Sequence, residues 1–101
     1  MSHIMVVATL KLRDEKFLED WKKLSHWIDK DLKKNAKGFL TRESVRAEEG
    51  TLRCILTWES REASDAFNAS LGTRDDFAEV SSEFGRIIDV ENMSREFFEV
   101  I

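Results

Sequence analysis

A chain of 101 residues is long enough for one modest hydrophobic core, so we expect a single domain over residues 1–101. Hydrophobic residues make up 42% of the chain and charged residues 36%, as in a soluble globular protein, and the net charge of −4 argues against a nucleic-acid partner. No run of 18 apolar residues and no signal-peptide pattern is present, so we expect no membrane partner. The single cysteine, Cys54, cannot form an intrachain disulfide, which favours a cytoplasmic location.

The first part of the chain predicts a strand and then a long helix. Residues 4–12 are apolar and β-branched, with apolar side chains at period two, which is typical of a strand. Asp14 can cap the helix that follows, and residues 33–38 end it with cations and then a glycine. The helix carries an apolar face made of Phe17, Trp21, Leu24, Ile28 and Leu32. Trp27 lies beside this face, either as a flank of the core or as part of an association surface.

Two strands, at residues 39–47 and 51–58, are predicted to form a hairpin around a turn at residues 48–50. Strict alternation would place the following side chains of the first strand on one face: Phe39, Thr41, Glu43 and Val45. In the second strand, the side chains that share a face are Leu52, Cys54, Leu56 and Trp58. We expect both sets to face the helices.

The last part of the chain predicts a second helical region and a final strand. Ser60 caps a helix over residues 61–71, Gly72 interrupts it, and residues 73–76 have the capping pattern of a new helix. The apolar face of the new helix comprises Phe77, Val80, Phe84, Ile87 and Ile88. Residues 93–101 form the last strand. The order β-α-β-β-α-β predicts an α+β fold, the ferredoxin-like plait.

A plait with its helices on one side leaves the other face of its sheet bare. That face would carry Val7, Thr9, Leu40, Ile55 and Thr57, which is a mixed and partly apolar surface. A second copy of the chain is the simplest cover, so we expect a homodimer, with a monomer whose sheet face is sufficiently polar as the alternative.

The stretch CILTWESREASDAF, at residues 54–67, resembles the antibiotic-biosynthesis monooxygenase (ABM) superfamily, and the FFEVI-like final strand supports this resemblance. Members of that superfamily are dimeric α/β barrels that include cofactor-free quinol oxygenases and haem-degrading monooxygenases. The resemblance implies a monooxygenase that oxidises a small phenolic or quinol-type aromatic substrate with O2, without a bound metal or flavin. It also implies a pocket for a small apolar aromatic ligand.

The chain departs from the superfamily at several functional positions. The haem-degrading branch places an Asn where Ala8 stands and an iron-binding His where Ser81 stands. Other members have His at positions that match Phe67 and Asp76, and some use tyrosines, which this chain lacks. Neither His3 nor His26 is placed to replace them. A binding protein without turnover, for haem or another flat apolar ligand, therefore remains an alternative, as does a structural or regulatory dimer.

Trp58 and Glu43 are the candidate catalytic residues. The indole N–H of Trp58 could donate to an oxygen of a ligand or intermediate, although it could equally bond a backbone carbonyl within the core. Glu43 on the helix-covered face would have a raised pKa and could act as a general base, unless it lies in water or pairs with an arginine. The candidate substrate-binding residues are Phe39, Leu56, Phe67, Phe77 and Phe84, which would otherwise be ordinary core. Cys54 is predicted to be a small buried hydrophobe, and no metal site is predicted.

Overall fold

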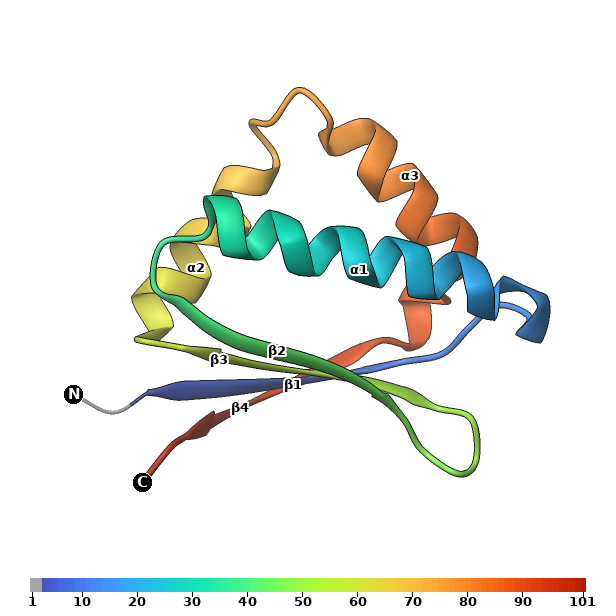
Figure 1. Cartoon of the computed structure of the whole chain (residues 1–101), viewed down its shortest axis with the longest axis horizontal. Helices are drawn as coiled ribbons and strands as arrows, with labels where there is room; N and C mark the ends of the chain where they lie inside the picture. Colours follow the sequence, from blue (N-terminus) through green and yellow to red (C-terminus); the bar gives the residue numbers. More distant parts are fainter. Residues whose placement is uncertain (1–2) are drawn as a thin grey trace.

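The computed structural model describes residues 3–101 as one four-stranded sheet with three helices on one side (Figure 1). The elements are β1 (Ile4–Leu10), α1 (Leu18–Asn35), β2 (Phe39–Arg46), β3 (Leu52–Trp58), α2 (Arg61–Leu71), α3 (Phe77–Ile87) and β4 (Ser94–Glu99). The strand order is β2-β3-β1-β4, and all neighbouring strands are antiparallel. The predicted α+β ferredoxin-like fold is confirmed. None of the helices between residues 3 and 101 is both long and apolar enough to cross a membrane.

The helices begin and end largely where capping residues predict. The Asp14 carboxylate accepts a hydrogen bond from the backbone N–H of Lys16 at 2.9 Å, which caps the short 3-10 turn that leads into α1. The Ser60 hydroxyl oxygen accepts one from the N–H of Ala63 at 3.1 Å and caps α2. After α1 the chain turns at Gly38, whose φ of 85° suits a residue without a Cβ.

Two predicted boundaries are wrong: the end of the first strand and the start of the last helix. β1 ends at Leu10, and Leu12 instead forms an isolated bridge to Ile88. Thr73 does not cap α3, because its hydroxyl donates to the carbonyl of Ser70 at 2.8 Å, and so it belongs to the turn that follows α2. The helix α3 begins only after Asp76, which makes no side-chain capping bond.

A β-bulge between Phe39 and Thr41 reverses the predicted faces of β2. Beyond the bulge, Arg42 lies opposite Leu56, on the helix-covered face, and Glu43 lies opposite Ile55, on the open face. The prediction that Glu43 shares a face with Phe39 is therefore wrong. The physical reason is that one extra residue in a strand sends every later side chain to the other side of the sheet.

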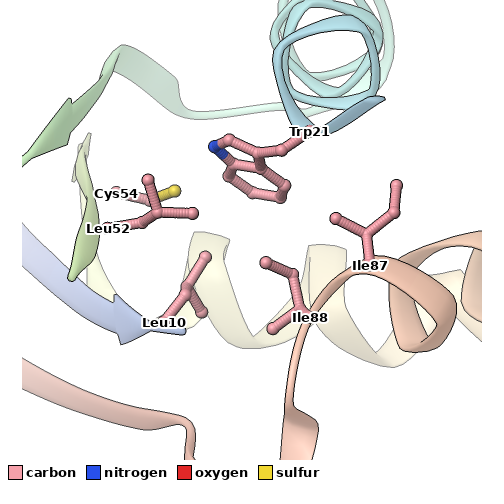
Figure 2. Packing of buried hydrophobic residues seen from close by; sticks show 6 residues of the cluster. All are labelled: Leu10, Trp21, Leu52, Cys54, Ile87 and Ile88. Carbon is pink, nitrogen blue, oxygen red and sulfur yellow. The ribbon is translucent and has the colours of Figure 1, made fainter. Parts of the chain in front are cut away.

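The core fills the space between the sheet and the helices in two clusters. The first joins Leu10, Leu52 and Cys54 from the strands to Trp21 of α1 and to Ile87 and Ile88 at the end of α3 (Figure 2). The second surrounds Val6, Leu32 and Trp58. Burying each large apolar side chain stabilises the fold by roughly 1.5–3 kcal/mol, so these clusters hold the helices against the sheet.

Within residues 3–101, no helix covers the opposite face of the sheet (Figure 1). Strand registry places Val7, Thr9, Ile55 and Thr57 there, as predicted, whereas Leu40 lies in the bulge. The same registry adds Met5, Val45 and Phe98, and Phe98 is 46% exposed. This face is a mixed surface with exposed apolar side chains.

Candidate active site

An apolar cavity of about 280 Å³ lies between the three helices. α1 contributes Trp27, Ile28, Asp31 and Leu32, α2 contributes Phe67 and Leu71, the following loop contributes Arg74 and Asp76, and α3 contributes Phe77, Val80, Ser81 and Phe84. The space exists because α2 ends at Leu71 and the chain turns before α3 starts at Phe77. A concave apolar space with few polar groups is the usual form of a small-molecule site.

The polar part of the cavity wall is an ion cluster centred on Arg74. Its guanidinium donates to both carboxylate oxygens of Asp31, at 2.7 and 2.8 Å, and to both of Asp76, at 3.2 and 3.1 Å. It also lies over the Trp27 ring, 5.9 Å from the centroid. The Asn35 amide donates to Asp31 at 2.8 Å. These contacts tie the loop between α2 and α3 to α1.

The ion cluster has a defined charge state. The hydrogen bonds from Arg74 hold the pKa of Asp31 below its ordinary value, and the same bonds raise the pKa of Arg74. Asp31 and Arg74 are therefore both charged near neutral pH. Of the five N–H groups of a guanidinium, four are occupied by the two carboxylates within the described structure, and one on Nη1 is left for a ligand.

Three of the predicted substrate-binding residues line this cavity: Phe67, Phe77 and Phe84. Phe39 and Leu56 do not; they pack in the core beside Trp58. The Trp58 ring is 2% exposed and contacts Phe67, with the ring centroids 5.8 Å apart. Trp58 therefore lies behind the cavity wall, against Phe67.

Glu43 is not part of the cavity. It is exposed on the open face of the sheet, so the helix-covered, apolar environment that would have made it a base is absent. Cys54 is buried as predicted, and this burial raises the pKa of its thiol despite the Arg42 guanidinium 3.5 Å away.

The positions that the superfamily resemblance singles out converge on the cavity. Phe67, Asp76 and Ser81 all line it, whereas Ala8 lies half-buried against the core. None of the lining residues is a histidine, cysteine, methionine or tyrosine, and residues 3–101 form no group suited to a metal ion. The residues present therefore do not fit a haem held by a proximal side chain.

Sequence reasoning missed Asp31 and Arg74 as site residues. Asp31 follows Ile28 by three positions, so a carboxylate borders the apolar face of α1, and this was the available signal. Nothing local connects Asp31 to Arg74, because the two are 43 positions apart and meet only through the path of the loop.

Neither a scan against protein-family models nor a search of curated proteins gives a match. Solved structures do match. A proposed antibiotic biosynthesis monooxygenase from Caulobacter crescentus is 22% identical with a TM-score of 0.79, covering 99% of this chain and 91% of that one. SnoaB, a cofactor-independent oxygenase from Streptomyces nogalater, is 11% identical with a TM-score of 0.72, covering 99% and 94%. A conserved Methanosarcina mazei protein is 15% identical with a TM-score of 0.75, covering 97% and 92%.

These structures share one architecture along nearly the whole of each chain. The chain therefore has the fold of the antibiotic biosynthesis monooxygenase proteins, as the resemblance of residues 54–67 predicted. At these identities the likeness establishes the fold, and activity has to be argued from the cavity.

Proposed function

We propose that this protein is a cofactor-independent monooxygenase that oxidises a small phenolic or quinol-type aromatic substrate with O2. The observation that carries the proposal is the apolar cavity of about 280 Å³ with one ion cluster in its wall. Its aromatic and aliphatic side chains suit a flat ring. The cluster supplies the few polar contacts that orient the ring oxygen.

The chemistry needs no reductant besides the substrate. For a ring ketone with an acidic CH2 group, such as anthrone, a base removes one proton and leaves a carbanion whose charge spreads onto the ring oxygen. The carbanion gives one electron to O2, and the resulting pair of radicals joins through a new C–O bond to form a peroxide anion. This anion takes the proton back from the base and becomes a hydroperoxide. Loss of water then leaves a C=O group. One oxygen atom enters the product and the other leaves in water.

In this proposal Asp76 accepts the proton and Arg74 holds the oxyanion. Asp76 is the more exposed carboxylate of the cluster, with 39% of its side chain accessible against 10% for Asp31. Protonation of Asp76 weakens its bonds to Arg74, so the guanidinium N–H groups become available to the negative oxygen of the substrate. Trp58 acts as a positioning residue through Phe67. Glu43 is given no role.

Oxygen uptake with anthrone and with hydroquinones tests the proposal. Removing one donor to an oxyanion typically costs about 100-fold in rate, so we expect Arg74→Gln to slow uptake by about that factor. Arg86→Gln is the matched control, because Arg86 is likewise ion-paired to α1, from α3 to Asp20 at 3.1 Å, but does not line the cavity. Uptake that equals the uncatalysed rate, or that is the same in both variants, would contradict the proposal.

A binding protein without turnover is the second candidate. It is favoured by the position of Trp58, whose indole is behind Phe67 and therefore not a donor in the cavity. Saturable binding of anthrone followed by recovery of unchanged anthrone after aerobic incubation would support this function over the oxygenase.

We further propose that the open face of the sheet pairs with a second copy of the chain. Its exposed apolar side chains, Phe98 and Val45 among them, support a self-complementary contact. Light scattering should give about twice the mass of the 11.8 kDa chain. Phe98→Asp should lower that mass, and a wild-type mass equal to that of one chain would refute the dimer.

A further inference from the structure

The charges of the side chains that line the cavity do not cancel. Arg74 contributes one positive charge and Asp31 and Asp76 contribute two negative charges, which leaves the wall with one net negative charge. Every other lining side chain is uncharged. Lys34 is near enough to help lower the pKa of Asp31, but it does not line the cavity. A bound ligand therefore meets a negative wall.

The same cluster offers a ligand mainly acceptors. Four of the five guanidinium N–H groups of Arg74 are already occupied, so an anionic ligand finds one free N–H, on Nη1, and would have to displace a carboxylate to reach any other. Asp76 is partly exposed, and each carboxylate oxygen can accept more than one hydrogen bond. The ligand group that fits best beside Asp76 is therefore a donor.

We infer that the cavity selects flat aromatic ligands whose polar end donates hydrogen bonds and is neutral or cationic, a hydroxyl or an ammonium group, and that it rejects carboxylates of the same shape. A carboxylate would add a second net negative charge to this apolar cavity, whereas an ammonium group would neutralise the wall. This inference rests on the proposed function for the location of the ligand, and it adds the charge class of the substrate.

Calorimetric titration with three ligands that share a naphthalene ring tests the inference. The ligands are 2-naphthol, 2-naphthylmethylammonium and 2-naphthoate near neutral pH. We expect the ammonium ligand to bind about tenfold more tightly than the carboxylate, with naphthol between them. In Asp76→Asn the wall becomes neutral, so the ratio of the two charged ligands should fall toward one.

Asp76→Asn should leave the fold intact, because Asp76 makes no side-chain capping bond at the start of α3 and the amide oxygen can still accept from Arg74. Asp75→Asn is the matched control. It removes the same charge at the neighbouring exposed residue, which does not line the cavity, and should keep the wild-type ratio.

Three results would overturn the inference: naphthoate binding as tightly as the ammonium ligand, equal changes in Asp76→Asn and Asp75→Asn, or no binding of any of the three ligands. The outcome is separable from that of the oxygenase proposal. Charge-selective binding without oxygen uptake would uphold the inference and contradict the oxygenase. Oxygen uptake with charge-independent binding would uphold the oxygenase and contradict the inference.

Discussion

Replacing Arg74 by Gln should destabilise the protein by about 2 kcal/mol, because it removes the ion pair that anchors the loop between α2 and α3 to α1. The magnitude follows from burial. An exposed pair contributes roughly 0.2–1 kcal/mol, whereas breaking a buried pair costs roughly 3–5 kcal/mol. The Asp31 side chain is 10% exposed and that of Arg74 25%, so this pair lies between the two cases. Asp31 keeps its bond from the Asn35 amide, which limits the loss.

Urea unfolding followed by tryptophan fluorescence would measure this loss, and a parallel melt should show a Tm lower by about 10 °C. In a double-mutant cycle with Asp31→Asn, the double variant should be less destabilised than the sum of the single variants. Arg86→Gln, whose ion pair with Asp20 is nearly half exposed on both sides, should cost under about 1 kcal/mol. If Arg74→Gln costs no more than Arg86→Gln, the burial argument is refuted.

The difference in stability between the wild type and Arg74→Gln should depend on pH with a defined sign. The pKa of Asp31 is lowered in the folded state, so its stabilising effect is present above its unfolded pKa and is lost as the pH falls through the folded value. The stability gap between the wild type and Arg74→Gln should therefore be constant near neutral pH and shrink below about pH 4. A gap that widens with acidification would contradict the assignment of the lowered pKa to this pair.

Three further predictions concern packing. Gly38→Ala should lower the free energy of unfolding in urea by about 2 kcal/mol or more, because the new Cβ would lie 2.7 Å from the Cβ of Ala63 at a φ of 85°. Gly50→Ala, also at positive φ but with no contact closer than 3.5 Å, should cost less. Equal losses in the two variants would count against a steric clash with Ala63. The Cys54 thiol should react slowly with a disulfide reagent until urea unfolds the chain, and rapid labelling of the folded protein would disprove its burial. Val80→Phe should fill the cavity and abolish ligand binding while changing the free energy of unfolding by no more than about 3 kcal/mol; unchanged binding would place the ligand elsewhere.

The fold was predictable because its signals are local. The caps at Asp14 and Ser60, the alternation in β3 and the glycine turn after α1 each act over a few residues. Glu43 was misplaced because alternation assumes an uninterrupted strand. A single bulge at Leu40 inverts the remainder of β2, and nothing in the residues themselves distinguishes a bulged strand from a regular one.

The cavity was only partly predictable. Phe77 and Phe84 appear in the sequence on the apolar face of α3, but periodicity alone does not separate a cavity wall from filled core, as Phe39 and Phe67 illustrate. The contact between Arg74 and Asp31 depends on how the interhelical loop folds back onto α1, which is a tertiary property.

One experiment tests most directly whether oxygen chemistry takes place in the cavity. The wild type and Val80→Phe are each incubated with anthrone under oxygen gas labelled with the heavy isotope. Mass spectrometry of the ketone product is the readout. We expect one labelled oxygen atom in each product molecule made by the wild type. In Val80→Phe, where a ring occupies the substrate's space, we expect a rate of labelling at least about tenfold lower. Labelling at the same rate in both proteins, or at the same rate without protein, would contradict the proposal.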